Sequence, residues 1–218
     1  MSEQTQDTQQ TLIPPRVDTD GGVIIYLHGP ITDDSVSRVI NDVHNYGDAP
    51  NIQLNIKSIG GDFDAAIALV DIVKEYNINT HVSGYAYSGA ALIFLSGIRR
   101  TMGKHACLML HEMAYVFSGR LKAHEREARH FRKRMKIHDD IVCENTRITH
   151  LDLDSHYEKQ EDYRISYEEA IRLNAVTDVL HEYVEERDID IDGMSVRMPV
   201  TISEYISVED AIQQETAA

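Results

Sequence analysis

The chain alternates short apolar segments with amphipathic ones, and this alternation is the feature that most restricts its fold. Residues 23–27 form a continuous apolar run, and residues 52–56 alternate apolar with polar side chains; both patterns are typical of strands. Residues 33–43 and 64–76 instead place apolar side chains three or four positions apart, which is the period of a helix. Strand, helix, strand and helix in succession favour a sheet joined by crossover connections. The sequence therefore predicts an α/β domain.

Two short strands in the next part of the domain are each followed by a residue with catalytic potential. A predicted strand at residues 79–82 leads into Gly84–Ala91, a segment of small residues that contains Ser88. A second predicted strand, residues 106–110, is followed directly by His111. Folds of this class usually carry their functional residues where strands end. Ser88 and His111 are therefore the first candidates for a functional site.

Ser88 and His111 are a chemically compatible pair. A serine hydroxyl is a poor nucleophile near neutral pH unless a base removes its proton, and a histidine can act as that base. Upstream, Gly60 and Gly61 follow the predicted strand and allow a turn that directs backbone N–H groups toward a developing oxyanion. The simpler interpretations are that Ser88 only caps a helix and that His111 is structural. The combination favours a serine peptidase.

The charge of the chain argues against one broad class of function. Its formal net charge of −15 disfavours a partner bound through phosphate groups, because such binding needs concentrated Lys and Arg. The one basic run, residues 126–136, is interleaved with acidic and apolar residues. We interpret it as a solvated helix face or a subunit contact. No nucleic-acid partner is expected.

Cysteine content and hydropathy indicate the compartment. Only Cys107 and Cys143 are present, which implies no disulfide framework and is typical of a reducing environment. Residues 1–11 lack the apolar core of a secretory signal, and no apolar run reaches the length of a membrane span. The sequence predicts a soluble, cytoplasmic protein with no membrane partner.

No metal and no cofactor are expected. The segment that begins at His111 starts like the His-Glu-x-x-His motif of zinc peptidases, but Tyr115 stands where the second histidine is required. The histidines at 124, 130 and 138 are not four residues apart, so one helix face would not bring them to one ion. The chemistry of a serine and a histidine needs no cofactor.

Three regions are expected along the chain. Residues 1–20 are polar and are predicted to form a disordered arm, residues 21–182 one α/β domain, and residues 183–218 an acidic C-terminal extension that contains a strand. Within the domain, residues 120–147 have the pattern of one long helix. Its heptad seam is only half apolar, so a partly wet contact with a neighbouring helix and a surface helix against its own core both fit.

Several segments resemble, in order, the proteolytic subunit of the Clp protease. They are residues 23–29, Ile56–Gly61, Gly84–Ala91, Met109–His111 and Asp162–Leu180, and the resemblance covers residues 22–182. One such motif is weak evidence, whereas several in register at compatible spacing are strong evidence. The resemblance implies a crotonase-like α/β fold in which residues 120–147 form a long handle helix. It also implies a homo-oligomer of rings, heptameric or stacked, that encloses a proteolytic chamber.

Taken residue by residue, the resemblance implies the chemistry of the site. Ser88 matches the nucleophile and His111 the general base, while Asp162 matches the acid that orients the histidine. The backbone N–H groups of Gly61 and Gly89 match the oxyanion hole. The implied activity is that of a serine endopeptidase, which cleaves peptides or unfolded proteins with a Ser-His-Asp catalytic triad.

The chain departs from the family pattern in three places. Ile59 replaces the proline of the usual Ser-Pro-Gly-Gly turn, and residues 112–119 replace the usual Gln-Pro and glycine-rich strand. Residues 1–20 do not resemble the segment that meets the unfoldase, which argues against an ATP-driven unfoldase partner. A divergent member, of the kind borne by a phage or a plasmid, fits this pattern. Two alternatives stay open: a non-catalytic ring subunit that assembles with an active relative, and an acyl-CoA hydrolase or hydratase on the same fold.

Overall fold

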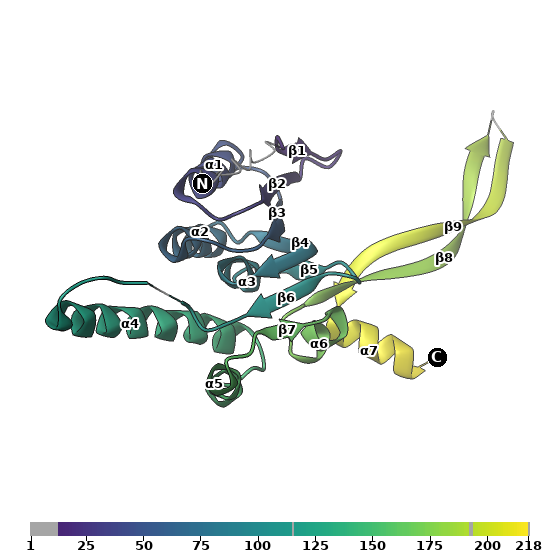
Figure 1. Ribbon diagram of the computed structural model, residues 1–218. Coiled ribbons are helices and arrows are strands. Elements are labelled where there is room, and N and C mark those ends of the chain that lie inside the picture. Colours follow the sequence, from purple (N-terminus) through teal and green to yellow (C-terminus); the bar gives the residue numbers. More distant parts are fainter. Residues whose placement is uncertain (1–12, 115, 192–193, 218) are drawn as a thin grey trace, which may run out of the picture.

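Figure 1 shows the computed structural model of the chain, which describes residues 13–114, 116–191 and 194–217. A mixed sheet of seven strands contains β1 (Arg16–Val17), β2 (Val23–His28), β3 (Ile52–Ser58), β4 (Asn79–Tyr87), β5 (Arg100–Met102), β6 (Cys107–Leu110) and β7 (Tyr163–Ile165). A separate hairpin consists of β8 (Asp178–Ile191) and β9 (Met194–Ser207). The helices are α1 (Asp33–Asn45), α2 (Phe63–Glu75), α3 (Gly89–Leu95), α4 (Leu121–Asn145), α5 (His150–Lys159), α6 (Tyr167–Arg172) and α7 (Val208–Ala217). The predicted α/β class is confirmed.

The topology of the main sheet brings the ends of separate strands together. Its strand order is β1-β2-β3-β4-β6-β7, and β5 pairs with β4. Strands β2, β3, β4 and β6 are parallel, whereas β1 and β7 are antiparallel to their neighbours. Helices α1 and α2 connect β2 to β3 and β3 to β4, as the predicted crossover connections require. Because β4 and β6 run side by side, the residues that follow them lie at the same edge of the sheet.

Local sequence determines where α2 begins and which face it buries. Asp62 is the N-cap, and its Oδ1 accepts a hydrogen bond from the N–H of Ala65 at 2.8 Å. Leu69 and Val73, one turn apart, are both fully buried. This face packs against α3, whose residues are all buried. The segment that follows Ser88 is thus fixed in the core.

Helix α4 is the predicted long helix. Its buried residues, His138, Ile141 and Val142, lie toward its C-terminal end, so only this end belongs to the core. Leu121 at the other end is 75% exposed, and Figure 1 shows this part of α4 extending away from the sheet. Neither α4 nor any other described helix is long and apolar enough to cross a membrane.

A buried arginine joins the C-terminal end of α4 to the sheet. Arg100 in β5 is 7% exposed, and its guanidinium donates hydrogen bonds of 2.8–3.2 Å to the backbone carbonyls of Gly97, Asn145, Asn174 and Ala175. Burial lowers the pKa of Arg100, and the charge of Asp178 opposes this shift. The carbonyl oxygens take the place of water around the charge. The Arg100 side chain therefore links β5 both to the C-terminal end of α4 and to the segment between α6 and β8.

Both ends of the chain differ from the expected regions. Residues 1–12 of the predicted arm lie outside the described residues, whereas Arg16–Val17 pair with Val23–Ile24 and cover an edge of β2. The end of the arm is therefore part of the sheet. The predicted strand of the C-terminal extension coincides with β9, but its partner β8 begins at Asp178, inside the predicted domain. The hairpin projects from the side of the molecule opposite to α4 (Figure 1).

Candidate active site

Ser88 occupies a strained corner between β4 and α3. Its φ is 55° and its ψ is −128°; a positive φ is uncommon for a residue with a Cβ and costs about 1–3 kcal/mol. The N–H of Ser88 donates to the carbonyl of Met109 at 2.8 Å, which holds the corner against β6. The Ser88 hydroxyl makes no capping hydrogen bond to α3. Ser88 thus holds the N-cap position of α3, but its side chain does not cap the helix.

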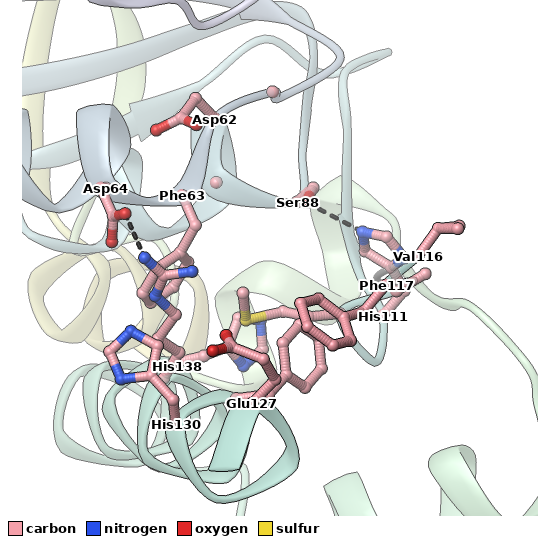
Figure 2. A pocket seen from close by; sticks show the side chains of 16 residues that line it. Asp62, Phe63, Asp64, Ser88, His111, Val116, Phe117, Glu127, His130 and His138 are labelled. Atoms are coloured by element: carbon pink, nitrogen blue, oxygen red, sulfur yellow. Dashed lines mark hydrogen bonds and ion pairs between the residues drawn. The ribbon is translucent and has the colours of Figure 1, made fainter. Parts of the chain in front are cut away.

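His111 lies directly opposite this hydroxyl. Because Tyr87 pairs with Met109 in the parallel register of β4 and β6, Ser88 and His111 follow at neighbouring strand ends. Nε2 of His111 is 2.8 Å from Oγ of Ser88 (Figure 2). Burial lowers the pKa of His111, while Asp162 raises it and His138 lowers it further. A lowered pKa keeps the imidazole neutral near pH 7, so that Nε2 can accept the hydroxyl proton.

Asp162 lies near His111 but is turned to another partner. Strand β7 pairs antiparallel with β6 through Leu110 and Tyr163, so Asp162 is the next residue toward His111. Its Oδ2 is 3.1 Å from Nη2 of Arg164, and its side chain is 43% exposed. Among the described residues, no hydrogen bond joins the Asp162 carboxylate to His111. Asp162 acts on His111 through its negative charge, which raises the pKa of the imidazole.

The turn after β3 can be formed only by glycines. Gly60 has a φ of 89° and Gly61 a φ of 154°. A Cβ on Gly60 would lie 2.6 Å from the carbonyl oxygen of Tyr87, and one on Gly61 would lie 2.2 Å from that of Ile31. Two backbone hydrogen bonds hold the turn in place. The N–H of Ile31 donates to the carbonyl of Gly60, and the N–H of Asp62 donates to the carbonyl of Ile31. This turn therefore passes very close to the Ser88 corner without a proline at position 59.

The N–H groups of Gly61 and Gly89 have no protein acceptor among the described residues. Gly89 is the first residue of α3, where a helical N–H has no intrahelical partner. Both glycines line the same pocket as Ser88 and His111. Two available N–H donors beside a nucleophile are what an oxyanion hole requires.

The pocket beside Ser88 lies between the sheet and α4. Its volume is about 440 Å³. Figure 2 shows Phe63 on one side, with Phe117, Glu127 and His130 around the rest of the cavity. An ion pair between Asp64 and Arg134 joins α2 to α4 beside it. The pocket has room for a side chain of a bound chain, and aromatic and charged groups both line it.

A family search gives the affiliation. The family model described as Clp protease matches residues 16–183. The chain belongs to the Clp protease family. A search of curated proteins finds no match to the chain. Members of the Clp protease family are peptidases, so the comparison supports a hydrolase of peptide bonds.

The fold agrees with the affiliation to the Clp protease family. The mixed sheet with its helices is consistent with the crotonase-like fold expected from the resemblance, and α4 is its long handle helix. Residues 184–218, which include most of the β8–β9 hairpin and all of α7, lie beyond the part that the Clp protease model matches.

Sequence reasoning missed a second histidine at the site. His138 on α4 is 2% exposed and lines the pocket. Its Nδ1 is 2.9 Å from Oδ1 of Asp139, and the hydroxyl of Tyr157 donates to the same Oδ1 at 2.8 Å. Nε2 of His138 is buried without a hydrogen-bond partner among the described residues. The available signal was its spacing, because His138 follows Phe131 by seven residues and both line the pocket.

Other chemistry has little support in the described part of the chain. Within it, no three His, Cys, Asp or Glu side chains gather as metal ligands would. Cys107 and Cys143 are free thiols, and both are half-buried. Burial raises the pKa of Cys143, which disfavours the thiolate that a cysteine nucleophile needs.

Proposed function

We propose that the chain is a serine endopeptidase of the Clp type, with Ser88 as nucleophile and His111 as general base. The observation that carries the proposal is the 2.8 Å contact between Oγ of Ser88 and Nε2 of His111. It is made at the edge of a pocket that Gly61 and Gly89 also line. The strained backbone of Ser88 supports the same assignment, because such strain is commonly kept at functional sites.

The proposed reaction begins with proton transfer. Nε2 of His111 accepts the hydroxyl proton while Oγ of Ser88 bonds to the carbonyl carbon of the scissile peptide. The π electrons of the carbonyl move to its oxygen, and the N–H groups of Gly61 and Gly89 stabilise the resulting oxyanion. The imidazolium then gives its proton to the leaving amine as the C–N bond breaks. An acyl group remains on Ser88, and water activated by His111 releases it by the same steps.

Asp162 is proposed as the acid of the triad. Its negative charge raises the pKa of His111 and so favours the imidazolium formed during reaction. The carboxylate now pairs with Arg164, whose guanidinium also lies 5.6 Å from the centre of the Tyr87 ring. A rotation of Asp162 toward Nδ1 of His111 would complete the triad. Subunit assembly is the proposed trigger for this rotation, because β7 follows α5, which contacts the handle helix α4.

The proposed substrates are peptides and unfolded proteins, and the proposed setting is a closed homo-oligomeric chamber in the cytoplasm. The family affiliation supports peptide substrates and an oligomer. The net charge of −15 again argues against a nucleic-acid partner. An ATP-driven unfoldase is not part of the proposal, since residues 1–20 do not resemble the segment that meets the unfoldase.

A second candidate is a ring subunit without catalytic activity. The observation that favours it is the orientation of Asp162, which pairs with Arg164 and not with His111. In this case Ser88 and His111 would shape the chamber wall of an assembly whose active subunits are another protein. The two proposals differ in one property, the reactivity of the Ser88 hydroxyl.

Labelling with a fluorophosphonate probe tests this property. We expect the purified chain to be labelled, Ser88→Ala not to be labelled, and Ser118→Ala, an exposed serine beside the pocket, to be labelled normally. Native mass read from the same samples shows whether an unlabelled protein is assembled. An assembled but unlabelled wild type would support the non-catalytic subunit. Labelling of Ser88→Ala would show that another serine is the nucleophile.

A further inference from the structure

Two exposed surfaces of opposite charge lie on α4 and on the β8–β9 hairpin. The first, here called the basic stripe, consists of Lys122, Arg126, Arg129, Lys133 and Lys136 on α4. The second, here called the acidic face, contains Glu182, Glu186 and Asp188 on β8. The stripe residues are spaced by four, three, four and three positions and share one side of the helix. The acidic residues are separated by even numbers and share one face of the strand.

The basic stripe has few partners within its own chain. Lys136 pairs with Asp140 at 2.8 Å, and Arg126 lies 3.8 Å from Glu127. Lys122, Arg129 and Lys133 have no acidic partner among the described residues, although Glu125 stands at the edge of the stripe. Like charges one turn apart repel each other. In a chain of net charge −15, a row of five cations is therefore a surface that an anionic partner would stabilise.

The basic stripe is separate from the candidate active site. Phe131 and His138 line the pocket and therefore lie on the side of α4 that faces it. By helical spacing, Arg129 and Lys133 lie about half a turn away from these two residues. A partner on the stripe would therefore leave the pocket accessible.

The acidic face has the composition of a docking surface. Val184 lies on it between Glu182 and Glu186, and Leu180 lies just before Glu182 with Tyr205 paired to it on the same face. The exposed fraction is 44% for Leu180, 66% for Val184 and 44% for Tyr205. No cationic side chain pairs with Glu186 or Asp188 among the described residues, although Arg197 lies opposite Asp188 in the register. Exposed apolar groups beside charged ones are typical of an interface, and a two-stranded ribbon is marginally stable until something packs on it.

The two surfaces agree in length. From Glu182 to Asp188 the strand rises about 20 Å, at about 3.3 Å per residue. From Lys122 to Lys136 the helix rises about 21 Å, at about 1.5 Å per residue. Ile137, which is 43% exposed, lies beside the C-terminal end of the stripe and offers an apolar contact there. A ribbon laid along the helix would thus bring its carboxylates over the whole stripe.

We infer that the acidic face of one copy of this chain docks on the basic stripe of a second copy. The hairpin and the exposed part of α4 extend from opposite sides of the molecule, so the hairpin does not reach the stripe of its own chain (Figure 1). A contact between two different surfaces is head-to-tail, and repetition of such a contact closes a ring or continues as a filament. The interface is independent of the proposed chemistry of Ser88.

Charge reversal on each surface tests the interface. The stripe variant is Arg129→Glu with Lys133→Glu, and the ribbon variant is Glu186→Lys with Asp188→Lys. Lys74→Glu with Lys159→Glu is the matched control, because it removes the same charge from exposed positions outside the stripe. Self-association is measured by sedimentation velocity and native mass spectrometry at several salt concentrations. Circular dichroism and thermal unfolding show that each variant is folded.

We expect the stripe and the ribbon variants to associate at least about tenfold more weakly than the wild type, and the control to associate normally. Mixing the stripe variant with the ribbon variant should restore association, because an acidic stripe then meets a basic ribbon on another copy. This rescue in the mixture requires contact between copies. Added salt should weaken the wild-type assembly.

Three outcomes would overturn the inference. They are a wild type that stays monomeric, folded single-surface variants that assemble like the wild type, and a mixture that shows no rescue. Binding of a labelled oligonucleotide that depends on the stripe, together with unchanged assembly, would assign the stripe to nucleic acid instead. Fluorophosphonate labelling of the same samples reports on Ser88 separately, so that failure of the interface and failure of the proposed chemistry can be told apart.

Discussion

Replacing Gly61 with alanine tests the turn that faces the nucleophile. The new Cβ would lie 2.2 Å from the carbonyl oxygen of Ile31, about 1.2 Å short of ordinary van der Waals contact. This carbonyl oxygen accepts a hydrogen bond from the N–H of Asp62 in the same turn, so it cannot move away alone. The turn itself must move. A positive φ adds about 1–3 kcal/mol of strain for a residue with a Cβ. Gly61→Ala should therefore lose both stability and the position of one oxyanion donor.

Gly84→Ala provides the matched control. Gly84 also has a positive φ, 88°, but a Cβ there would have nothing within 4 Å. It should cost only the backbone strain, about 1–3 kcal/mol, and leave hydrolysis of a fluorogenic peptide nearly unchanged. Gly61→Ala should cost more stability than Gly84→Ala and lower kcat by about 10²–10³-fold, the usual effect of losing one oxyanion donor.

Urea unfolding and steady-state kinetics on the two variants measure these quantities. Equal stability losses in the two variants would refute the steric argument. Full activity in a folded Gly61→Ala variant would refute the assignment of its N–H to the oxyanion hole.

Four further predictions concern titration and buried polar contacts. Because burial lowers the pKa of His111 below its ordinary value of 6.5, kcat/KM should fall only at a pH below 6.5. Asp162 raises this pKa, so Asp162→Asn should move the fall in kcat/KM to a still lower pH. The same lowered pKa means that the contribution of His111 to stability is present above pH 6.5 and is lost as the pH falls through the folded-state pKa, which acid titration of unfolding measures. Arg100→Met should lower the free energy of unfolding by about 3–5 kcal/mol, because buried carbonyls lose their donor. Tyr157→Phe should cost about 1.5–3 kcal/mol in the same assay, because Asp139 loses a hydrogen bond.

Each of the three substitutions has an outcome that contradicts its prediction. An acid limb of kcat/KM that moves to higher pH in Asp162→Asn would mean that the carboxylate does not act on His111 through its charge. Arg147→Met, at a more exposed arginine that also donates to a carbonyl, is the control for Arg100, and equal losses in both would exclude a special role for burial. A Tyr157→Phe variant as stable as the wild type would show that Asp139 is satisfied by other donors.

The sequence was most informative where function depends on short segments. Ser88, His111 and the glycine turn each follow a strand with a clear pattern, and the parallel order of the sheet brings them together. The direction of the Asp162 carboxylate could not be predicted in the same way. It depends on whether the carboxylate turns to the guanidinium of Arg164 or to Nδ1 of His111, which the linear pattern does not determine.

Two other features were hidden for different physical reasons. The role of His138 arises because α4 crosses the site, and a histidine on a helical seam has no local signal that separates a pocket residue from a core residue. Strand β8 was not predicted because acidic residues occupy much of it, whereas its pairing is fixed by the clearer alternation of β9. The arm before β2 was predicted to be disordered, but its end at Arg16–Val17 pairs with β2 through backbone groups, which leave little trace in side-chain composition.

The buried guanidinium of Arg100 also constrains the order in which the chain can fold. Three of its carbonyl partners lie 45, 74 and 75 residues further along the chain. The strands up to β6 can pair while that charge is still hydrated, but burying it must wait until residues 174 and 175 arrive. A nascent chain that ends within α4 would therefore hold an incompletely solvated cation at the side of its sheet. We expect such an intermediate to be short-lived and to be consolidated only when the segment between α6 and β8 docks.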